Sequence, residues 1–578
     1  MTNAQIAAAL DELGDLYELD GAVQYRVLAY RTAARTVREA SASVEQLVRD
    51  GRATELPGIG KTLEEKLRVL IETGDMKQAQ KLRAQFPSGL IAMMHLPGFG
   101  PKRARRLYDE LGIDSLEKLR AAAEAQQLRS LRGFGAKAEE KLLETLAAGH
   151  DGSPAPRWLL SRAEPVAEQI ADALRAAPGA DRVEVAGSLR RRADAVKDLD
   201  IVATTADPAA MVAALTGHPL VDSVQSSGEA GARVVLHSGM TVDLKVVAPD
   251  QFGNVLQHFT GSKNHNVALR EAAVRRGLHV SEYGILDDAD GATLRCPTEE
   301  AVYERLGMAW IPPELREGRG ELEAAAAGTL PELVTLEDLR GDLHSHTVLS
   351  DGRQDVEAMA EGARAKGYEY FAITDHSASH GFGNHVEPDA LRAQIERVRG
   401  LNAELDDLEL LIGTETNVLT DGTLDYDDEL LAQLDWVVAS VHTSFGMSEA
   451  DMTARVVAAI EHPYVDVIGH PTGRKIELRS PYAIDIERVI EAAARTHTML
   501  EINAAPDRRD LNAIHARAAA EAGVLIVVDS DAHSVRNLDL MRFGIATARR
   551  AWLTPAQVAN TRPWAELQKL RKRSRAAA

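Results

Sequence analysis

The pattern of apolar and polar positions divides the chain into regions of different kinds. Residues 1–150 consist of short amphipathic stretches with apolar residues at helical spacing, punctuated by glycines. Residues 157–312 alternate helical stretches with short strand-like runs, such as 182–185 and 199–203. From Gly341 onward, apolar strand-like runs alternate with helical runs, which is typical of a parallel α/β fold. The pattern predicts a multidomain protein that is helical first, then α+β, then α/β.

Composition narrows the class of protein. The 578 residues allow roughly three to four domains by the usual size of a domain. A single cysteine, Cys296, excludes a disulfide framework and a cysteine-based zinc module, and it fits a reducing compartment. No apolar run approaches the ~20 residues of a membrane helix, and residues 1–20 lack the basic start and apolar stretch of a secretory signal. We expect a cytoplasmic protein with no membrane partner.

Charge is unevenly distributed along the chain. The formal net charge of -21 argues at first against a nucleic-acid partner. The excess of acidic residues lies after residue 150, however, and residues 1–150 are nearly neutral. Local patches decide whether a polyanion binds, so the first region can still bind one. The basic run 571–575 is expected to be a solvated terminus.

Three segments repeat a turn of glycine, apolar residue and glycine that leads into a helical run with a lysine. Such a turn exposes backbone N–H groups at the start of a helix, where they bind a phosphate without contacting a base. One such turn is usually an ordinary helix connection, but three in one chain favour a binding function. The segments resemble helix-hairpin-helix motifs, which implies salt-sensitive, non-specific DNA binding. The expected DNA-binding residues are Gly58, Gly60, Lys61, Gly98, Gly100 and Lys102, and the third segment is 131–137.

A cluster of carboxylates is expected in the middle of the chain. Asp198 and Asp200 are two residues apart on a predicted strand, so both side chains point to one face. Asp243 lies on a later strand-like run. Three clustered carboxylates repel one another unless cations lie between them, which indicates Mg²⁺ or Mn²⁺. Asp-x-Asp alone is common on surfaces, but here it follows Gly-Ser-x-Arg-Arg at 187–191, and together they form the nucleotidyltransferase pattern.

Further motifs narrow the substrate. The run His-Phe-Thr-Gly-Ser at 258–262 precedes a helical stretch. With the hairpins and the three aspartates, residues 1–315 resemble the family X DNA polymerases, of which DNA polymerase beta is a familiar member. The resemblance implies that the aspartates hold two catalytic metal ions and that deoxynucleotides are added to gapped or primer-template DNA. One departure is His258, which stands where beta-type enzymes carry tyrosine. The implied nucleotide-binding residues are Gly187, Ser188, Arg191, Phe259, Gly261, Asn266 and Arg270.

The resemblance also identifies a possible lyase residue in the first region. Lys66 matches the lysine that forms a Schiff base with an abasic sugar in beta-type enzymes. Thr62 and Gln78 stand where those relatives carry supporting lysines. A nucleophilic lysine needs neighbouring cations to lower its pKa. The missing lysines argue against lyase activity.

Metal-ligand residues recur through the last region, nearly always just after an apolar strand-like run. The carboxyl ends of barrel strands converge at one face, so these side chains are expected to meet there. A single histidine is usually a surface or core residue, but seven segments with this placement favour a metal site. The series resembles the polymerase and histidinol phosphatase (PHP) domain. The candidate ligands are His344, His346, Asp351, His376, Glu415, His442, His470, Asp531 and His533.

The PHP resemblance implies a distorted (β/α)7 barrel with three divalent ions, which Zn²⁺, Mn²⁺ or Fe could provide. Arg474 and Lys475 either clamp the phosphate or belong to the solvated surface. The implied ligand sets are His344, His346, Glu415 and Asp531 for one ion, Glu415, His442 and His470 for the second, and Asp351, His376 and His533 for the third.

Together the motifs predict a monomeric family X DNA polymerase that fills short gaps in DNA repair and carries a phosphoesterase. The phosphoesterase is expected to be a Mn²⁺-dependent 3′-5′ exonuclease, with abasic-site endonuclease and 3′-phosphatase as alternatives. Two other classes stay open: a small-molecule phosphatase with a DNA-binding tether, and a non-catalytic DNA-binding scaffold. The expected domains are an 8-kDa-like helical domain (1–85), a fingers-like helical domain (86–150), a nucleotidyltransferase palm (151–250), a thumb (251–315), a linker (316–340) and the PHP domain (341–578).

Overall fold

The computed structural model describes residues 1–40, 42–94, 96, 100–130, 139, 142–143, 146, 157–381 and 383–576. The chain folds into two compact units. The first comprises Met1–Trp158, Pro165–Val185 and Lys197–Ala248, and the second comprises Leu159–Glu164, Ala186–Val196 and Pro249–Ala578. Gly98 and the third glycine segment, 131–137, lie outside the described residues.

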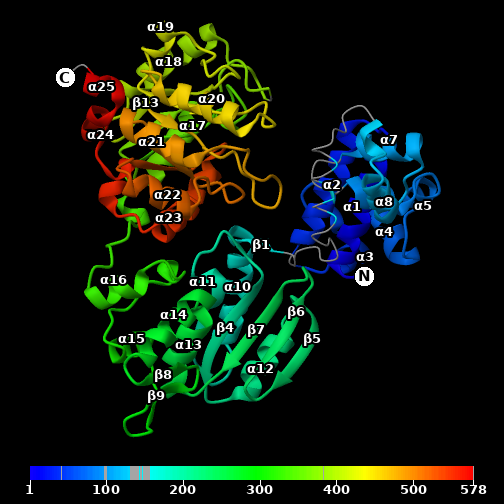
Figure 1. Cartoon of the computed structure of the whole chain (residues 1–578), viewed down its shortest axis with the longest axis vertical. Helices are drawn as coiled ribbons and strands as arrows, with labels where there is room; N and C mark the ends of the chain where they lie inside the picture. Colours follow the sequence, from blue (N-terminus) through cyan, green and yellow to red (C-terminus); the bar gives the residue numbers. More distant parts are fainter. Residues whose placement is uncertain are drawn as a thin grey trace. The chain divides into compact units, whose positions relative to one another are not determined.

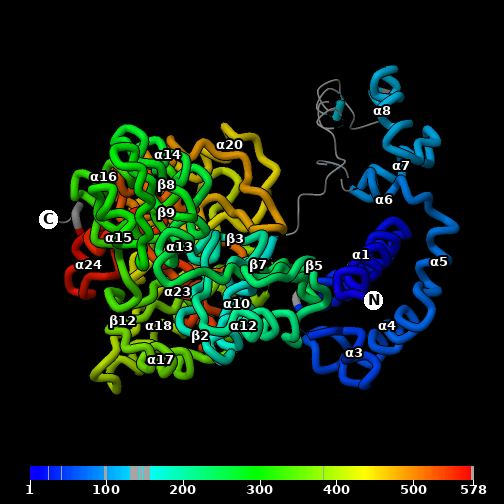
Figure 2. Tube along the Cα trace, turned by 90° about the horizontal axis from the view of Figure 1, so that it is seen from below, coloured from blue at the N-terminus to red at the C-terminus, as the bar shows by residue number. Residues whose placement is uncertain are grey.

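The first unit begins with a helical region built around α1 (Asn3–Leu19). Thr2 caps α1 in a capping box with Gln5, and the buried face of α1 includes Ile6, Leu10 and Leu13. Figure 2 shows the chain from α3 to α8 passing around α1. The other helices are α2 (Gln24–Glu39), α3 (Val44–Arg49), α4 (Lys61–Thr73), α5 (Lys77–Arg83), α6 (Ser88–Met94), α7 (Pro101–Leu111) and α8 (Leu116–Glu124), with short 3-10 turns at Ala53–Glu55 and Leu128–Ser130.

The first unit also contains a five-stranded sheet in the order β2-β4-β7-β6-β5. β4 and β7 are parallel, and the other neighbouring pairs are antiparallel. Helix α12 (Pro208–Thr216) packs against β5 and β6 (Figure 1). The strands are β2 (Ala180–Val185), β4 (Asp198–Thr205), β5 (Val221–Gly228), β6 (Gly231–Leu236) and β7 (Thr241–Val246). The chain also forms two short strands and a helix here, β1 (Trp158–Leu159), β3 (Ala195–Val196) and α10 (Leu160–Arg175), of which β3 and the start of α10 belong to the second unit.

The second unit has a smaller part with its own hydrophobic core, and this core extends into the segment expected to be a linker. Within 316–340, Leu322, Ala325 and Leu333 pack with Leu269 in one core, because α16 presents an apolar face. Residues 316–333 therefore belong to the same packed body as the helices before them, whereas Val334 and Leu339 pack in the core of the barrel. The elements are α11 (Gly187–Arg190), α13 (Phe252–Thr260), α14 (Lys263–Val274), β8 (Leu278–Ser281), β9 (Gly284–Asp287), β10 (Thr293–Leu294), α15 (Glu299–Arg305) and α16 (Glu321–Ala327), with 3-10 turns at Pro249–Gln251, Pro313–Leu315 and Leu336–Asp338.

The rest of the second unit is a parallel barrel whose seven strands neighbour one another in chain order. The first and last strands meet through a parallel bridge between Ser345 and Ala532, and the His346 N–H donates to the Ala532 carbonyl over 2.8 Å. The expected (β/α)7 barrel is confirmed. Its strands are β11 (Gly341–Asp342), β12 (Tyr370–Ile373), β13 (Glu409–Asn417), β14 (Trp436–Ser440), β15 (Val467–Ile468), β16 (Met499–Asn503) and β17 (Ile526–Asp529).

Helices cover the outside of the barrel and bury the main apolar cluster against its strands. Most lie between successive strands, as the alternating pattern of the sequence predicts. They are α17 (Val356–Ala365), α18 (Pro388–Asn402), α19 (Asp428–Leu431), α20 (Glu449–Glu461), α21 (Ile486–Thr496), α22 (Ala513–Glu521), α23 (Met541–Arg550), α24 (Trp564–Leu570) and α25 (Lys572–Ala576), with 3-10 turns at Val535–Leu540, Pro555–Gln557 and Ala559–Thr561.

Helix α24 closes the amino-terminal end of the barrel. Its Trp564 contacts Trp436 and Tyr370, the first residues of β14 and β12. The basic run that follows contradicts the expectation of a solvated terminus. Lys572 donates to two main-chain carbonyls over 2.6 Å, and Arg573 donates to the buried Asp466 carboxylate over 2.8 Å. Main-chain carbonyls at the C-terminal end of α20 and a buried acid explain why the run docks. None of the described helices is long and apolar enough to cross a membrane.

Candidate functional site

The three predicted aspartates lie on two neighbouring parallel strands of the first unit. Asp200 on β4 is in register with Asp243 on β7, and Asp198 precedes Asp200 by two residues. Leu199 and Ile201, which alternate with the two β4 aspartates, are buried, so the alternation of the strand turns both β4 carboxylates to the partly exposed face. The structure thus places all three aspartates on one face of adjacent strands.

Basic side chains accompany these carboxylates. Arg233 on β6 is the cross-strand neighbour of Asp243, and its guanidinium lies 3.5 Å from the Asp243 carboxylate. The Lys245 ammonium lies 3.7 Å from the same carboxylate. Sequence reasoning missed Arg233, whose only signal is its register on the next strand. Oxygen-only donors on a partly open face fit Mg²⁺ or Mn²⁺.

The predicted nucleotide-binding residues belong to the second unit. Gly187 has a positive φ of 65° at the start of α11, a conformation that glycine adopts without strain. Arg191 follows α11, donates to the Thr260 carbonyl over 2.6 Å and lies 3.2 Å from the Glu317 carboxylate. The residue before it, Arg190, makes a bidentate pair with Glu299, with both distances 2.8 Å. Both arginines therefore contact Thr260 at the end of α13: Arg190 donates to its hydroxyl and pairs with Glu299, and Arg191 donates to its carbonyl and pairs with Glu317.

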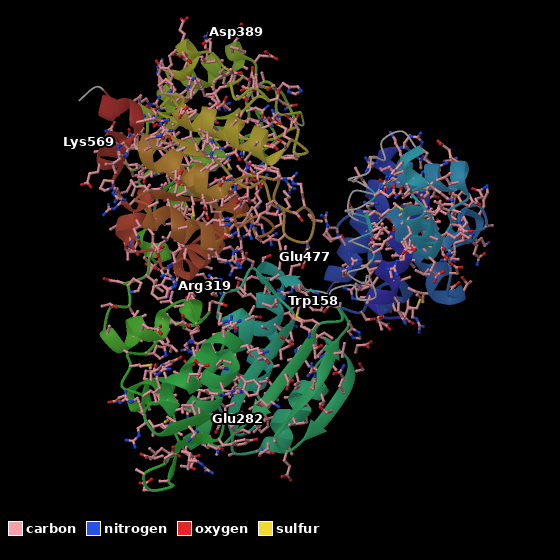
Figure 3. The ribbon with its side chains drawn as sticks, viewed as in Figure 1. Trp158, Glu282, Arg319, Asp389, Glu477 and Lys569 are labelled. Atoms are coloured by element: carbon pink, nitrogen blue, oxygen red, sulfur yellow. The ribbon has the colours of Figure 1, made fainter. Side chains whose placement is uncertain are left out.

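The end of α13 and the start of α14 hold the other predicted nucleotide contacts. Gly261 has a φ of 37°, and a Cβ there would lie 2.8 Å from the Asn266 amide nitrogen, so a larger residue would be strained and would displace the Asn266 side chain. Asn266 donates to the His258 carbonyl over 2.7 Å. His258 also lies 3.4 Å from Arg270 and 3.4 Å from Glu282, which Figure 3 labels between β8 and β9. The structure brings Phe259, Gly261, Asn266 and Arg270 to one turn around His258.

The described glycine hairpins lead into helices as the sequence predicts. Gly60 is the N-cap of α4, whose first residue is Lys61. Gly100 is the N-cap of α7, in which Lys102 is the second residue. Gly58 has a φ of 79°. Each turn thus exposes the first N–H groups of a helix, and the partner of Gly100 in the second hairpin, Gly98, lies outside the described residues.

Lys66, the residue of the expected lyase site, contacts Tyr30. Its ammonium donates to the Tyr30 hydroxyl and lies 5.0 Å from the centre of that ring. Burial raises the pKa of Tyr30, so its phenol stays neutral. The lyase role of Lys66 stays a prediction.

All nine predicted PHP ligands meet at the carboxyl end of the barrel, with Glu415 at the centre. Glu415 is the seventh residue of β13 and is almost fully buried. Five imidazoles contact its carboxylate, and these contacts hold its pKa well below the usual value against the effect of burial. The distances are 3.5 Å to His344, 3.7 Å to His346, 2.7 Å to His376, 3.2 Å to His442 and 3.0 Å to His470.

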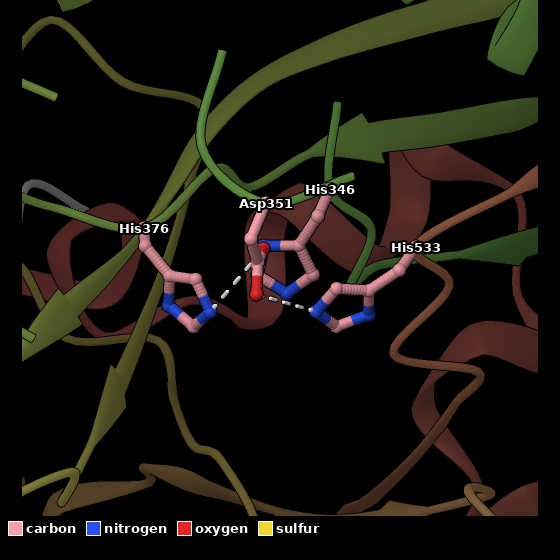
Figure 4. A group of neighbouring side chains, drawn as sticks. All are labelled: His346, Asp351, His376 and His533. Carbon is pink, nitrogen blue, oxygen red and sulfur yellow. Dashed lines mark ion pairs between the residues drawn. The ribbon is translucent and has the colours of Figure 1, made fainter. Parts of the chain in front are cut away.

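Three groups of possible ligands have donor atoms that all lie within 4.8 Å of one another: His346, Asp351, His376 and His533; His344, His346 and Asp531; and His376, Glu415 and His442. In the described parts of the chain, no other group of at least three such residues has donor atoms this close together. Asp198, Asp200 and Asp243 therefore do not form such a group. Figure 4 shows Asp351 paired with His376 and His533, at 3.7 and 3.2 Å. The grouping differs from the predicted sets, because His346 and His376 each belong to two groups and His470 to none.

The protonation of this cluster depends on burial and on opposite charges. Burial and neighbouring imidazoles lower the pKa of His346 to about 4, so it is a neutral, metal-competent imidazole. Burial alone would lower the pKa of His533, but the contact with Asp351 raises it to about 9. Nitrogen and oxygen donors at this spacing fit divalent ions of the Zn²⁺, Mn²⁺ or Fe type.

Two residues that sequence reasoning missed form hydrogen bonds with the predicted metal ligands. Glu501 on β16 lies 2.6 Å from Nδ1 of His344, and it accepts the main-chain N–H of His470. Asn503 donates to the Asp531 carboxylate over 3.0 Å. Such partners fix the tautomer and orientation of metal ligands. Both residues lie within β16, whereas the sequence pattern predicts ligands just after a strand.

Seven of the nine ligands, all but His344 and His346, line a cavity of about 580 Å³ with basic side chains around it. Lys475, Arg479 and Arg508 line this cavity, and Arg508 lies 3.7 Å from Asp531. Arg479 stacks on Phe445 at 4.1 Å. Of the two predicted phosphate clamps, Lys475 lines the cavity and Arg474 does not, because its guanidinium pairs with Asp194 at 2.8 Å. Metal ligands and cations around one cavity can bind a phosphoester.

Comparison with known proteins covers nearly the whole chain. Family models match as a helix-hairpin-helix domain at residues 1–76, a SAM-like helix-hairpin-helix tandem at 90–148, a DNA polymerase beta thumb at 255–317 and a PHP domain at 342–505. The chain is 37% identical over 576 residues to the DNA polymerase/3′-5′ exonuclease PolX of Bacillus subtilis, which covers 99% of this chain and 100% of that protein.

Other relatives cover a smaller part. A probable phosphatase of Caldanaerobacter subterraneus is 34% identical over 205 residues, which is 33% of this chain and 75% of that protein. A probable phosphatase of Thermoanaerobacter pseudethanolicus is 32% identical over 238 residues, 38% of this chain and 89% of that protein.

Proposed function

Because this chain belongs to the bacterial family X DNA polymerases that carry a C-terminal PHP domain, we propose that it fills short gaps in DNA and trims 3′ ends at two separate sites. It is a DNA polymerase with 3′-5′ exonuclease activity. The observation that carries this proposal is the similarity over 99% of the chain to an enzyme with both activities. The three aspartates of β4 and β7 are the candidate site for polymerisation, and the cluster of histidines and carboxylates in the barrel is the candidate site for trimming.

For polymerisation, we propose that Asp198, Asp200 and Asp243 hold the metal ions, with Mg²⁺ or Mn²⁺ bound. Divalent ions at both sites of this protein supply positive charge that stabilises phosphate oxygens. Ser188 and Arg191 bind the triphosphate of the incoming nucleotide, because a hydroxyl and a guanidinium suit phosphate oxygens. The turn around His258 lies beside the sugar and the new base pair.

For trimming, we propose that the PHP cavity receives the 3′ end of a DNA strand. The nine ligand residues hold up to three divalent ions, of which we favour Mn²⁺. Lys475 and Arg508 line the same cavity and orient the phosphodiester by charge-assisted hydrogen bonds. Abasic-site endonuclease and 3′-phosphatase activities are alternative uses of this site, and the probable phosphatases among the relatives make a small phosphomonoester the second candidate substrate.

The domain assignment is also a proposal. We assign the 8-kDa-like and fingers-like domains to 1–85 and 86–150, the palm to 151–250, the thumb to 251–315 and the PHP domain to 341–578. The packing of α16 and Leu333 supports the addition of 316–333 to the thumb. The monomeric state and the cytoplasmic location stay predictions.

Variants of each candidate site test the proposal. Asp243→Asn should abolish extension of a primer on one-nucleotide-gapped DNA, because it removes a carboxylate of the metal site, and should leave 3′ trimming intact. His346→Ala should show the opposite pattern, and each variant serves as the control for the other. Added chelator should stop both activities of the wild type, and Mn²⁺ should restore both. Primer extension by Asp243→Asn at the wild-type rate would contradict the polymerase site.

The substrate of the PHP site needs its own assay. We expect release of nucleotides from a 3′-labelled DNA strand to exceed release of phosphate from a small phosphomonoester. Phosphate release from the small ester alone, with no loss of the DNA label, would favour the phosphatase alternative.

A further inference from the structure

The segment 186–196 carries the predicted nucleotide-binding residues Gly187, Ser188 and Arg191, and it lies with the barrel in the second unit. Four arginines of the barrel region contact this segment or its ion-pair partners. They are Arg474, Arg509, Arg542 and Arg550. None of these four has a role in the proposed polymerase or nuclease chemistry.

The backbone of the segment is held in an unusual conformation. Arg192 has a φ of 58°, which costs free energy for a residue with a side chain and persists only when surrounding contacts enforce it. The Arg509 guanidinium donates to the Arg192 carbonyl over 3.1 Å. The Arg550 guanidinium donates to the Arg191 carbonyl over 2.6 Å. Two successive carbonyls of the segment are therefore bonded by side chains of the barrel region.

Asp194 forms the charged part of the contact. Its carboxylate lies 2.8 Å from Arg474 and 3.3 Å from Arg509. Arg509 is fully buried and also donates to the Thr547 hydroxyl over 2.8 Å. Burial alone would raise the pKa of Asp194, but the arginines hold it below the usual value, so the carboxylate is charged at neutral pH.

The side chain of Arg191 depends on the same contact. Its guanidinium lies 3.2 Å from the Glu317 carboxylate, and Arg550 lies 2.9 Å from the same Glu317 oxygen. Arg550 thus contacts both the backbone of Arg191 and the counter-ion of its side chain. Arg550 therefore helps to hold both the backbone and the counter-ion of Arg191 in place.

We propose that the PHP domain positions the nucleotide-binding turn of the polymerase through Asp194 and Arg550. The inference rests on the proposed role of residues 187–191 in binding the triphosphate. A turn already held in its binding conformation loses less conformational freedom when the nucleotide binds, so its affinity is higher. Asp194 and Arg550 are positioning residues, and the affinity for the incoming nucleotide depends on the nuclease domain even when that domain binds no DNA.

Gap-filling kinetics of the full-length protein test this proposal. We expect Asp194→Asn and Arg550→Ala to raise KM for the nucleotide by about tenfold, with kcat reduced by less than about threefold, because ground-state positioning is lost and the metal site is not. Asp194→Glu keeps the charge and should lie closer to the wild type. Trimming of a 3′ end should be unaffected in all three variants.

Asp466→Asn is the matched control, because it also removes a carboxylate paired with an arginine of the barrel, Arg573, without contacting the segment. Its KM should equal that of the wild type. Nucleotide affinity is also measured directly, on a complex with a dideoxy-terminated primer, so that a variant with low activity is still informative. Unchanged KM and affinity in Asp194→Asn and Arg550→Ala, or an equal rise in Asp466→Asn, would overturn the proposal. A wild type that fails to fill gaps would instead refute the proposed function.

Discussion

Glu501 accepts three hydrogen bonds beneath the metal-ligand face: one from a ligand side chain, one from a ligand backbone and one from Asn503. One carboxylate oxygen lies 2.6 Å from Nδ1 of His344, and the other accepts the N–H of His470. A glutamine at this position has only one acceptor oxygen, so its NH₂ group would face a donor. Substitution of a residue that is not one of the nine ligands should therefore also weaken metal binding at this site.

Glu501→Gln should weaken metal binding by roughly 10- to 100-fold, the usual effect of losing a partner that orients a ligand. The affinity is measured by titration of the metal-free protein with Mn²⁺. Glu461→Gln is the control, because its carboxylate pairs with the exposed Arg495 away from the ligands. Equal Mn²⁺ affinity in Glu501→Gln and the wild type would show that Glu501 does not orient the metal ligands.

The sequence could predict the ligands but not Glu501. Nearly every ligand lies at or just after an apolar run, and the carboxyl ends of barrel strands converge, so position along the chain together with the PHP resemblance indicates the nine residues. Glu501 lies between the apolar Leu500 and Ile502, inside the strand. Only the barrel closure, which brings β16 beside His344, gives this buried carboxylate a partner.

At the scale of elements, Glu299 joins three segments of the smaller part of the second unit. It is the first residue of α15 and binds Arg190 of α11 and the fully buried Arg316. Burial alone would raise the pKa of Glu299, but Arg316 and Arg190 lower it to about 2. A pKa this far below the ordinary value corresponds to roughly 3 kcal/mol of stability at neutral pH.

The stability of these elements should fall as the pH decreases from about 4.5 towards 2, because a carboxylate with a lowered pKa stabilises the fold only while it is charged. Amide hydrogen exchange in α14 and α15 measures this local stability. Glu299→Gln should reduce protection at pH 7 by about 3 kcal/mol, since it leaves Arg316 buried without its partner. At pH 3 the difference between variant and wild type should shrink, and a constant difference would contradict this account.

Helix α16 shows where the local sequence pattern gives a wrong prediction. The run 316–340 contains glycines and a stretch of alanines, which predicts a linker, yet α16 packs its Leu322 and Ala325 into the core. Alanine favours a helix as strongly as any residue, and tertiary contacts decide whether such a helix packs. The side chains that pair with the buried Arg316 and Glu321 are those of Glu299 and His265, which lie earlier in the chain and so outside the local pattern.

At the scale of the whole molecule, the chain ends by docking on the barrel it has just completed. Arg573 pairs with Asp466 at 2.8 Å, and burial raises the pKa of Asp466. Composition alone could not predict this contact, because a basic run is usually solvated and the acid it meets lies 107 residues earlier.

Arg573→Ala should lower the free energy of unfolding of the barrel by about 2 kcal/mol, because it leaves the Asp466 carboxyl without its charged partner. The loss should grow as the pH rises, since deprotonation of Asp466 then places an unpaired charge in the interior. Urea unfolding followed by tryptophan fluorescence measures it. Lys569→Ala, at the exposed position that Figure 3 labels on α24, should have no effect. Equal stability of both variants would mean that the tail only lies on the surface.

The bonds on segment 186–196 also determine the order in which the protein can mature during synthesis. Arg509 and Arg550 lie 317 and 359 residues after the carbonyls that they hold. While the ribosome is still making the barrel, the nascent polymerase half therefore has its aspartates but not a fully supported nucleotide turn. The nucleotide-binding turn is thus complete only after the nuclease half has been made. A polypeptide released before that point would bind the incoming nucleotide weakly and fill gaps slowly.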